Sequence, residues 1–371
     1  RILAEDITAD VDSPPHRKSL VDGYAVQSKD LSSGHATLQV VEEVFAGQVP
    51  TRSLASGEAT RIMTGAPLPD GADAVAMVED TVLVDGDTEV VSVRTELAIG
   101  QNVQDRGVVM KSGEIVMRCG QRIRPIEIGL LCEVGRTEVV VAERPSVAML
   151  PTGDELVDAA QTPGPGQIRN SNGPMLHALA SASGAIPSSL GIGRDEPEVL
   201  RQTIESALQT SDILMLSGGV SMGQKDFVPA VLNELNVQTV FHRVQLRPGK
   251  PIWFGVWENG ENRTLVFGLP GNPVSSFVCY YLFVRPAIDA MQAAAPRLRH
   301  NTVHMNDAFT LTGNRPTYFP ARFVGNSDSI ELLRWKGSAD QRTLCEADCL
   351  AFLPAAGTYE KAAMISALPL E

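Results

Sequence analysis

The sequence predicts a multi-domain α/β plus β protein, in which a doubly wound, mostly parallel α/β domain is flanked by β-rich regions. The chain has 371 residues, which is too long for one ordinary domain. From Ser146 onward, short apolar runs alternate with segments of helical periodicity, whereas the flanking regions carry short runs of alternating polarity. Strand followed by helix, repeated along a chain, is typical of a parallel sheet with helices on both faces.

The α/β region is expected to contain four pairs of a strand and a helix. The expected strands are the apolar runs SVAML, SLGI, DILML and TLVFGL. The helices expected after them are residues 172–184, EPEVLRQTIESAL, VPAVLNEL and PVSSFVCYYLFVRPAI. The run FVCYYLFV is much shorter than the roughly 18 apolar residues of a membrane-spanning helix, so we expect it to be a buried helix.

The regions on either side are expected to consist of strands. Residues 1 to about 143 contain TLQVVEEV, AVAMVED and EVVSVRT, which predict an antiparallel, loop-rich unit. The tail after about residue 295 contains TVHMNDAFTL, YFPARFV, SIELLRW and CLAFLP, separated by Gly, Asn, Asp and Pro. This pattern predicts a small C-terminal β-barrel domain.

Charge and cysteine content limit the classes of partner. The formal net charge is −13 at pH 7, which disfavours binding to nucleic acid or to an anionic membrane. The five cysteines are scattered and form no CxxC pair, which favours a reducing, cytoplasmic location over a disulfide framework or a structural zinc site. An anionic ligand would therefore need a locally basic site.

Each of the four expected strands ends in a polar turn that contains glycine. The turns are PTGDE, GRDE, SGGVSMG and PGNP. Because the carboxyl ends of parallel strands lie at one edge of a sheet, we expect these turns to form a ligand site near the topological switch point.

The SGGVSMG loop is the most specific of these turns. Gly218 and Gly219 allow backbone N–H groups to face a ligand, and Ser217 and Ser221 add hydroxyl groups suited to a phosphate or a hydroxylated ring. The loop is not a P-loop, because no GKS or GKT follows, and its glycine spacing is not that of a dinucleotide-binding fingerprint. A tight turn between strand and helix, without a ligand, is the alternative.

The segment FHRVQLRPGKP forms a local basic patch. If it is extended, Arg243, Gln245 and Arg247 share one face, and Lys250 follows after a Pro-Gly turn. Cations placed close together would neutralise a phosphate or another oxyanion. The alternative is a solvated strand edge.

Four carboxylates follow the same strands: Asp154, Glu155, Asp195 and Asp226. Mg²⁺ prefers one or two carboxylates together with water and phosphate oxygens. Asp154 and Asp195 also suit helix caps. Glu155 and Asp226 are therefore the stronger metal-binding candidates.

Seven motifs occur in a fixed order: SLVDGYA, RIMTGAPLPDGADAV, TGDEL, GQIRNSN, SGGVSMGQKDF, RPGKP and LPGNPVS. In this order and spacing, the chain resembles the molybdopterin molybdenumtransferase family, which includes bacterial MoeA and the E domain of gephyrin. The resemblance covers nearly the whole chain, and the combination is far more specific than any one motif.

The resemblance implies a subunit of four parts. These are a split linking domain (1–9 with 114–143), a β-rich lobe (10–113), an α/β molybdopterin-binding domain (144–294) and a C-terminal β-barrel domain (295–371). It also implies a homodimer in which Asp22 of SLVDGYA reaches the active site of the other subunit. The family reaction takes adenylylated molybdopterin and molybdate, releases AMP with Mg²⁺, and leaves molybdenum on the dithiolene. Other proteins of molybdenum cofactor biosynthesis are the implied partners.

Matching the motifs to this chain gives the candidate site residues. Asp22, Glu155, Asp195 and Asp226 occupy acidic positions for catalysis, and all of these except Asp195 are the candidate Mg²⁺ ligands. Arg247 and Lys250 would hold the anion, and the backbone amides of Gly218 and Gly219 the phosphate. The complete set of candidate substrate-binding residues is Thr152, Gly153, Ser217, Gly218, Gly219, Ser221, Arg243, Arg247, Lys250, Pro270, Gly271, Asn272 and Pro273.

Three positions differ from the usual family pattern. Val109, Asn170 and Gln224 stand where family members commonly have an acidic residue. A valine cannot replace a carboxylate as a Mg²⁺ ligand. A paralogue that binds or carries the cofactor without turnover is therefore the alternative to the enzyme, and a scaffold whose tail domain binds a peptide is a third hypothesis.

Overall fold

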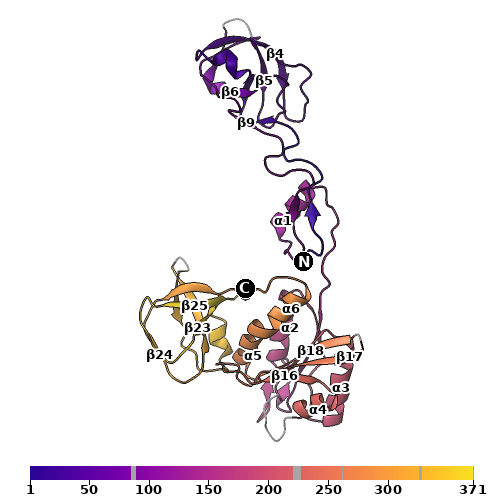
Figure 1. Ribbon diagram of the computed structural model, residues 1–371. Helices are drawn as coiled ribbons and strands as arrows, with labels where there is room; N and C mark the ends of the chain where they lie inside the picture. Colours follow the sequence, from indigo (N-terminus) through magenta and orange to yellow (C-terminus); the bar gives the residue numbers. More distant parts are fainter. Residues whose placement is uncertain (85–88, 220–226, 261, 326–327, 371) are drawn as a thin grey trace. The chain divides into compact units, whose positions relative to one another are not determined.

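A computed structural model describes residues 1–84, 89–219, 227–260, 262–325 and 328–370 (Figure 1). The chain divides into two compact units. The smaller unit consists of Leu3–Cys119 and Ile123–Val140, and the larger unit of Arg1–Ile2, Gly120–Arg122 and Val141–Glu371. Within the described ranges, no helix combines the length and the apolar character needed to cross a bilayer.

The smaller unit is built around a six-stranded sheet. In spatial order its strands are β6 (Ala74–Met77), β3 (Gly23–Val26), β5 (Glu58–Ile62), β4 (Ala36–Val44), β8 (Val90–Val93) and β7 (Thr81–Leu83). Tyr24 and Val26 pack on one side of the sheet and Ala25 on the other, as the two-residue period of a strand requires. The expectation of a wholly antiparallel unit is wrong for one pair, because β4 and β5 run parallel.

Short strand pairs and one helix complete this unit. β1 (Ile7–Thr8) pairs antiparallel with β10 (Ile115–Met117), and β2 (Lys18–Ser19) with β9 (Val103–Gln104). Helix α1 (Pro125–Glu133) starts with proline at its first position and packs beside the first of these pairs through a shared apolar cluster. Segments more than a hundred residues apart in sequence thus share one core.

The larger unit contains the predicted doubly wound sheet. Its strand order is β14 (Ile186–Ser189), β11 (Ser146–Pro151), β15 (Ile213–Ser217), β18 (Asn262–Leu269), β17 (Trp253–Asn259) and β16 (Gln238–His242). The first four strands are parallel, and β17 and β16 are antiparallel additions. The run SLGI is wrongly assigned as a strand, because β14 ends where that run begins.

Helices cover both faces of this sheet. α2 (Asn172–Ala182), α5 (Pro273–Cys279), a π-helical segment (Tyr280–Val284) and α6 (Arg285–Met291) pack on one face, and α3 (Pro197–Thr210) and α4 (Val228–Glu234) on the other. Successive residues of β11 feed the two cores alternately, with Val147 and Met149 in one and Ala148 and Leu150 in the other. The sheet is therefore buried on both faces, which explains why its strands are continuously apolar.

The C-terminal region forms the predicted barrel. It is a closed five-stranded barrel of β19 (Asn301–Met305), β22 (Ser329–Leu332), β21 (Thr317–Val324), β23 (Cys349–Leu353) and β25 (Met364–Pro369). The pair β20 (Phe309–Leu311) and β24 (Gly357–Tyr359) and the short helix α7 (Gln341–Leu344) lie outside it. The Val274 N–H donates to the Ser338 carbonyl at 3.0 Å, which joins the barrel domain to α5.

Candidate active site

A pocket of about 300 Å³ lies at the carboxyl ends of the parallel strands. Its wall includes Thr152 at the end of β11, Ser217 at the end of β15, and the turn Gly271–Pro273 after β18. The chain runs from β11 outward to β14 and then returns to β15 on the other side, so the switch point lies between β11 and β15. Ligands of open α/β sheets bind at this position.

The turn after β11 brings Glu155 into the pocket wall. Gly153 has φ +145°, and a Cβ on it would lie 2.5 Å from a carboxylate oxygen of Glu155. Glycine at this position thus leaves room for the carboxylate to lie directly against the backbone. Thr152 is only 2% exposed, and no described residue forms a hydrogen bond with its Oγ1.

The turn after β15 is held closely against Thr152. Gly218 has φ +90°, and a Cβ there would lie 2.5 Å from the Thr152 carbonyl oxygen. The Gly218 N–H already donates to the Leu269 carbonyl at 3.2 Å, so the expectation that it binds phosphate is wrong. Of these two glycines, Gly219, with φ +63°, remains the candidate whose backbone N–H would donate a hydrogen bond to a phosphate.

Asn172, at the start of α2, links two of the strand ends. Its Nδ2 donates to Ser217 Oγ and to the Gly271 carbonyl oxygen, both at 2.8 Å. A carbonyl oxygen can only accept, so the orientation of the amide is fixed. The buried Asn172 Oδ1 is left without a hydrogen-bond partner in the part of the chain that the structure describes. Asn172 is not among the predicted site residues, although the motif GQIRNSN contains it.

A second pocket of about 340 Å³ adjoins the first and shares Asn272 with it. Arg247, Lys250 and Pro270 line it, as expected of an anion site. Arg243 does not line it, because β16 ends at His242 and Arg243 turns the chain with φ +70°. The expectation that the whole segment is extended is therefore wrong, and Arg243 is not part of this pocket.

Asp154 and Asp195 lie at the same edge of the sheet but line neither pocket. The Asp195 N–H donates to Asp154 Oδ1 at 3.2 Å. The N-cap of α3 is Glu196, whose side chain makes no capping bond, and no helix follows Asp154 directly. Helix capping thus accounts for neither carboxylate in the way the sequence suggested.

Asp22 belongs to the smaller unit. Its Oδ1 accepts hydrogen bonds from the backbone N–H and the hydroxyl of Thr64, both at 2.7 Å. These two bonds favour the ionised form and lower the pKa of the Asp22 carboxyl below its ordinary value.

The donor set for a metal is incomplete within the described residues. Ser221, Gln224 and Asp226 lie outside them. Across the described part of the chain, no group of three or more His, Cys, Asp or Glu side chains is placed to hold a metal ion. Among the described residues, Glu155 is the one acid in the wall of the first pocket, and Mg²⁺ bound to nucleotides or other phosphates often uses only one or two carboxylates. The oxygen-rich lining therefore fits Mg²⁺ held jointly with a substrate phosphate.

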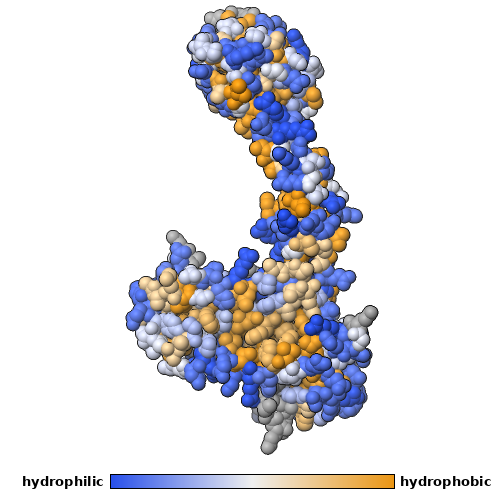
Figure 2. Space-filling model, viewed as in Figure 1, coloured by the Kyte–Doolittle hydropathy of each residue, from blue (hydrophilic) through white to orange (hydrophobic). Residues whose placement is uncertain are grey.

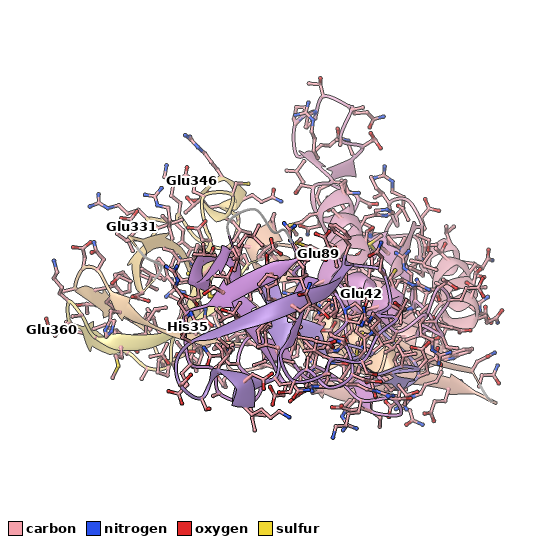
Figure 3. The ribbon with its side chains drawn as sticks, turned by 90° about the horizontal axis from the view of Figure 1, so that it is seen from above. His35, Glu42, Glu89, Glu331, Glu346 and Glu360 are labelled. Carbon is pink, nitrogen blue, oxygen red and sulfur yellow. The ribbon has the colours of Figure 1, made fainter. Side chains whose placement is uncertain are left out.

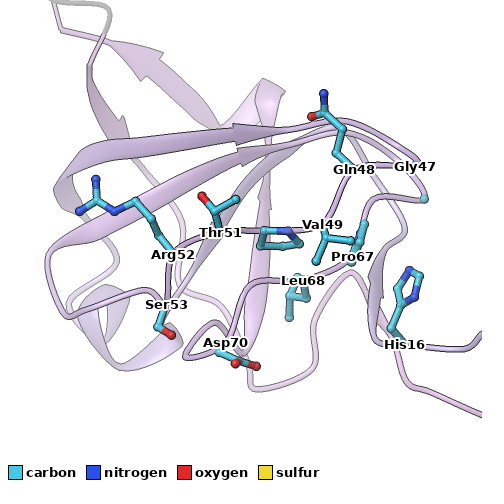
Figure 4. Close-up of a pocket in the computed structure, with 12 residues that line it drawn as sticks. His16, Gly47, Gln48, Val49, Thr51, Arg52, Ser53, Pro67, Leu68 and Asp70 are labelled. Carbon is cyan, nitrogen blue, oxygen red and sulfur yellow. The ribbon is translucent and has the colours of Figure 1, made fainter.

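The smaller unit has a separate pocket of about 470 Å³, shown in Figure 4. Val49, Pro67 and Leu68 give it an apolar wall, and Arg52 and Asp70 lie at its rim. None of the predicted site residues lines it, although its Gly65 follows Thr64, the partner of Asp22. The candidate active site is therefore assigned to the larger unit.

Several lining residues come from the barrel domain and were not predicted. Ala339 and Gln341 line the first pocket, and Arg315, Trp335 and Ser338 line the second. The only sequence signal was the polar, glycine-containing run KGSAD between two predicted strands. Sequence alone does not show which domain such a run will contact.

Comparison with known proteins identifies the chain's relatives. Two family models match it: the MoeA N-terminal region (domain I and II) over residues 1–135, and a probable molybdopterin-binding domain over residues 148–290. A molybdopterin molybdenumtransferase of Staphylococcus aureus (strain Mu50) is 37% identical over 297 residues, which cover 79% of this chain and 69% of the relative. This chain belongs to the molybdopterin molybdenumtransferase family.

Other comparisons agree with this assignment. A relative of the same name from Staphylococcus epidermidis (strain RP62A) is 36% identical over the same length. The crystal structure of the molybdopterin biosynthesis MoeA protein from Pyrococcus horikoshii OT3 matches 100% of this chain and 92% of its own, with a TM-score of 0.84 and 27% identity. The resemblance predicted from the seven motifs, the fold class and the assignment as an enzyme are confirmed.

Proposed function

We propose that this molybdenumtransferase inserts molybdenum from molybdate into adenylylated molybdopterin, and that water cleaves the phosphate link to AMP, at the two adjoining pockets. The observation that supports the proposal is that the two pockets are lined by chemically different side chains. The first pocket has Glu155 and two buried oxygens that no described residue hydrogen-bonds, and the second has cationic side chains. A substrate that combines a pterin with phosphates, and a metal oxyanion beside it, matches this contrast.

The pterin is assigned to the first pocket. Asn172 Oδ1 can only accept a hydrogen bond, and an unsatisfied buried acceptor costs about 1–3 kcal/mol. The amino group and ring N–H of a pterin are donors, whereas an ionised phosphate has none. The hydroxyl of Ser217 and the amide of Gly219 remain as donors for the phosphate, and Arg247 and Lys250 as cations for molybdate.

Mg²⁺ would be held by Glu155 and a phosphate oxygen, with Asp226 and Asp22 as further proposed ligands. Bound there, it would neutralise negative charge on the phosphates and favour departure of AMP. The absence of a side chain at Gly153 leaves the Glu155 carboxylate room beside the backbone, in the wall of the first pocket. Asp195 is a further proposed catalytic acid near this site. Its backbone N–H is hydrogen-bonded to Asp154 Oδ1.

The active protein is proposed to be a homodimer, in which Asp22 enters the site from the second copy. Figure 2 shows apolar surface on the larger unit over α2 and α5. Met175 and Leu179 of α2, and Leu282 and Phe283 of the π-helical segment, are only partly buried. Such a patch is typical of a subunit interface. The five free cysteines support a reducing compartment such as the cytoplasm, where other cofactor-biosynthesis proteins would supply the substrate.

The test is to incubate the full chain with adenylylated molybdopterin, molybdate and Mg²⁺ and to measure AMP by chromatography. Glu155→Gln should slow release about tenfold or more, because each ~1.4 kcal/mol of lost transition-state stabilisation costs a factor of ten. Glu196→Gln, an exposed acid of the same domain, is the matched control. Tight substrate binding with no AMP release would instead establish the carrier function, which the 63% exposed Val109 in place of an acid favours.

A further inference from the structure

We infer that the pocket of the smaller unit is a nucleoside site, which takes the adenosine part of the substrate's AMP group. The inference rests on the proposed function and concerns a cavity that none of the predicted site residues lines. Its wall includes part of the motif RIMTGAPLPDGADAV, to which the candidate active site gives no role. The cavity measures about 470 Å³, which is an ordinary size for a small-molecule site, and all of its lining residues belong to one unit.

Hydrogen bonds hold the two walls of this pocket in place. One wall is the loop 47–53 between β4 and β5, and the other is the turn 65–70 after β5. The Leu54 N–H donates to the Asp70 carbonyl at 2.7 Å, which ties the C-terminal ends of the two walls together. Glu42 of β4, labelled in Figure 3, accepts hydrogen bonds from the Thr51 N–H at 2.9 Å and from the Thr51 hydroxyl at 2.7 Å. A ligand therefore enters a formed pocket and has little chain to order.

The walls present apolar surface that suits a flat ring. Val49 and Pro50 come from the loop, and Pro67 and Leu68 from the turn. In Figure 4, Val49, Pro67 and Leu68 form the central part of the pocket. Val49 is 79% exposed, so an aromatic ligand that covered it would remove apolar surface from water. Burial of such surface favours binding of an aromatic ring.

Asp70, at the rim, gives the pocket an acceptor for an amino group. Its carboxylate forms no hydrogen bond or ion pair with any residue that the structure describes. An ionised carboxylate can only accept hydrogen bonds, so it selects a ligand with a donor. Adenine combines a flat ring with an exocyclic amino group and matches both features. The pterin is assigned to the first pocket, which leaves the adenine as the aromatic part of the substrate for this one.

The pocket also lies next to an acid that the proposed reaction uses. Gly65 lines the pocket and directly follows Thr64, whose N–H and hydroxyl both hold the Asp22 carboxylate. Arg52, at the rim, is partly neutralised by Glu58 at 3.9 Å, so the phosphate is not expected to bind here. In the proposed dimer, the copy that supplies Asp22 would therefore also hold the nucleoside of the leaving group.

The test is calorimetric titration of the full chain with adenosine, without pterin, molybdate or Mg²⁺, so that the outcome does not depend on turnover. Val49→Asp changes an exposed position, so the chain should fold, and the loss of apolar contact should weaken adenosine binding about tenfold or more. Val82→Asp, at an exposed valine of the same unit outside this pocket, should bind as the original chain does. No adenosine binding by the original chain, or an equal loss in the two variants, would overturn the inference.

A second series of titrations tests the acceptor. Inosine has an oxygen in place of the amino group of adenosine, so it should bind about tenfold more weakly. Asp70→Ala removes a side chain without partners among the described residues and should abolish this preference. A preference for adenosine that persists in Asp70→Ala would overturn the role of Asp70. Neopterin that binds more tightly than adenosine would assign the pocket to a pterin instead.

Titration with AMP connects the pocket to the substrate. AMP should lose affinity in Val49→Asp to the same extent as adenosine, and an unchanged AMP affinity would place the AMP group elsewhere and overturn the inference. The proposed function is tested separately. Adenosine binding by a chain that releases no AMP would reject the enzyme activity but leave the nucleoside site standing, and AMP release by a chain that binds no adenosine would do the reverse.

Discussion

At the scale of single residues, Asn172 shows how one amide organises the candidate site. Its two donor hydrogen bonds tie the start of α2 to Ser217 and Gly271, the ends of two different strands. Because those bonds occupy the nitrogen, the oxygen is the group left for a ligand. An aspartate would have the oxygen but could not donate to Gly271, so the role requires an amide.

The Asp22 carboxyl gives a prediction about pH. The backbone N–H and then the hydroxyl of Thr64 lower its pKa, so the stability that these bonds contribute is present above the ordinary aspartate pKa and is lost as pH falls through the lowered value. Thr64→Val removes the hydroxyl bond only. We expect the pKa of Asp22 to rise part of the way toward its ordinary value, as measured by NMR titration of the side-chain carboxyl.

Thr81→Val is the control for this titration, since the Thr81 hydroxyl donates to the Val78 carbonyl of the same unit. An Asp22 pKa that does not move in Thr64→Val, or that moves equally in both variants, would contradict the account.

At the scale of elements, the turn after β15 depends on glycine. A Cβ at Gly218 would collide with the Thr152 carbonyl oxygen. A non-glycine residue there would also have to keep a left-handed backbone conformation, which costs about 1–3 kcal/mol. We expect Gly218→Ala to lower the unfolding midpoint of the larger unit in urea and to abolish substrate binding. Tryptophan fluorescence reports on this unit alone, because Trp253, Trp257 and Trp335 all lie in it.

Gly271→Ala is the matched comparison. A Cβ at Gly271 would lie 3.7 Å from Gly218 Cα, an ordinary contact, and its φ is not positive. Its unfolding midpoint should stay close to that of the original chain. Equal destabilisation by the two substitutions would show that the strain at Gly218 is not the cause.

Periodicity predicted most of the elements, because burial on one or two faces leaves a direct record in the sequence. The segment that begins at Arg243 was wrongly predicted to be extended, because its exposed and buried residues alternate as in a strand although it forms a loop. There the backbone bonds run from Arg243 to Ile252 and from Val244 to Lys250, within a loop. Such partners depend on where the chain turns, and the positive φ of Arg243 had no signal in the sequence.

At the scale of the whole molecule, the site unites segments that are distant in sequence. The motifs predicted that Thr152, Glu155, Ser217 and Gly218 would lie with Gly271, and the structure places all five in one wall. They did not predict Arg315 or Ser338, because the contact between the barrel and the α/β sheet follows from surface fit rather than from local pattern. The barrel region thus contributes residues to the walls of both pockets.

The most direct measurement is a crystal structure of the full chain with adenylylated molybdopterin and molybdate, using anomalous scattering at the molybdenum absorption edge. We predict pterin density beside Asn172 and Ser217 and an anomalous peak beside Arg247 and Lys250. Molybdenum located elsewhere, or the pterin bound in the pocket near Val49 and Leu68, would contradict this prediction.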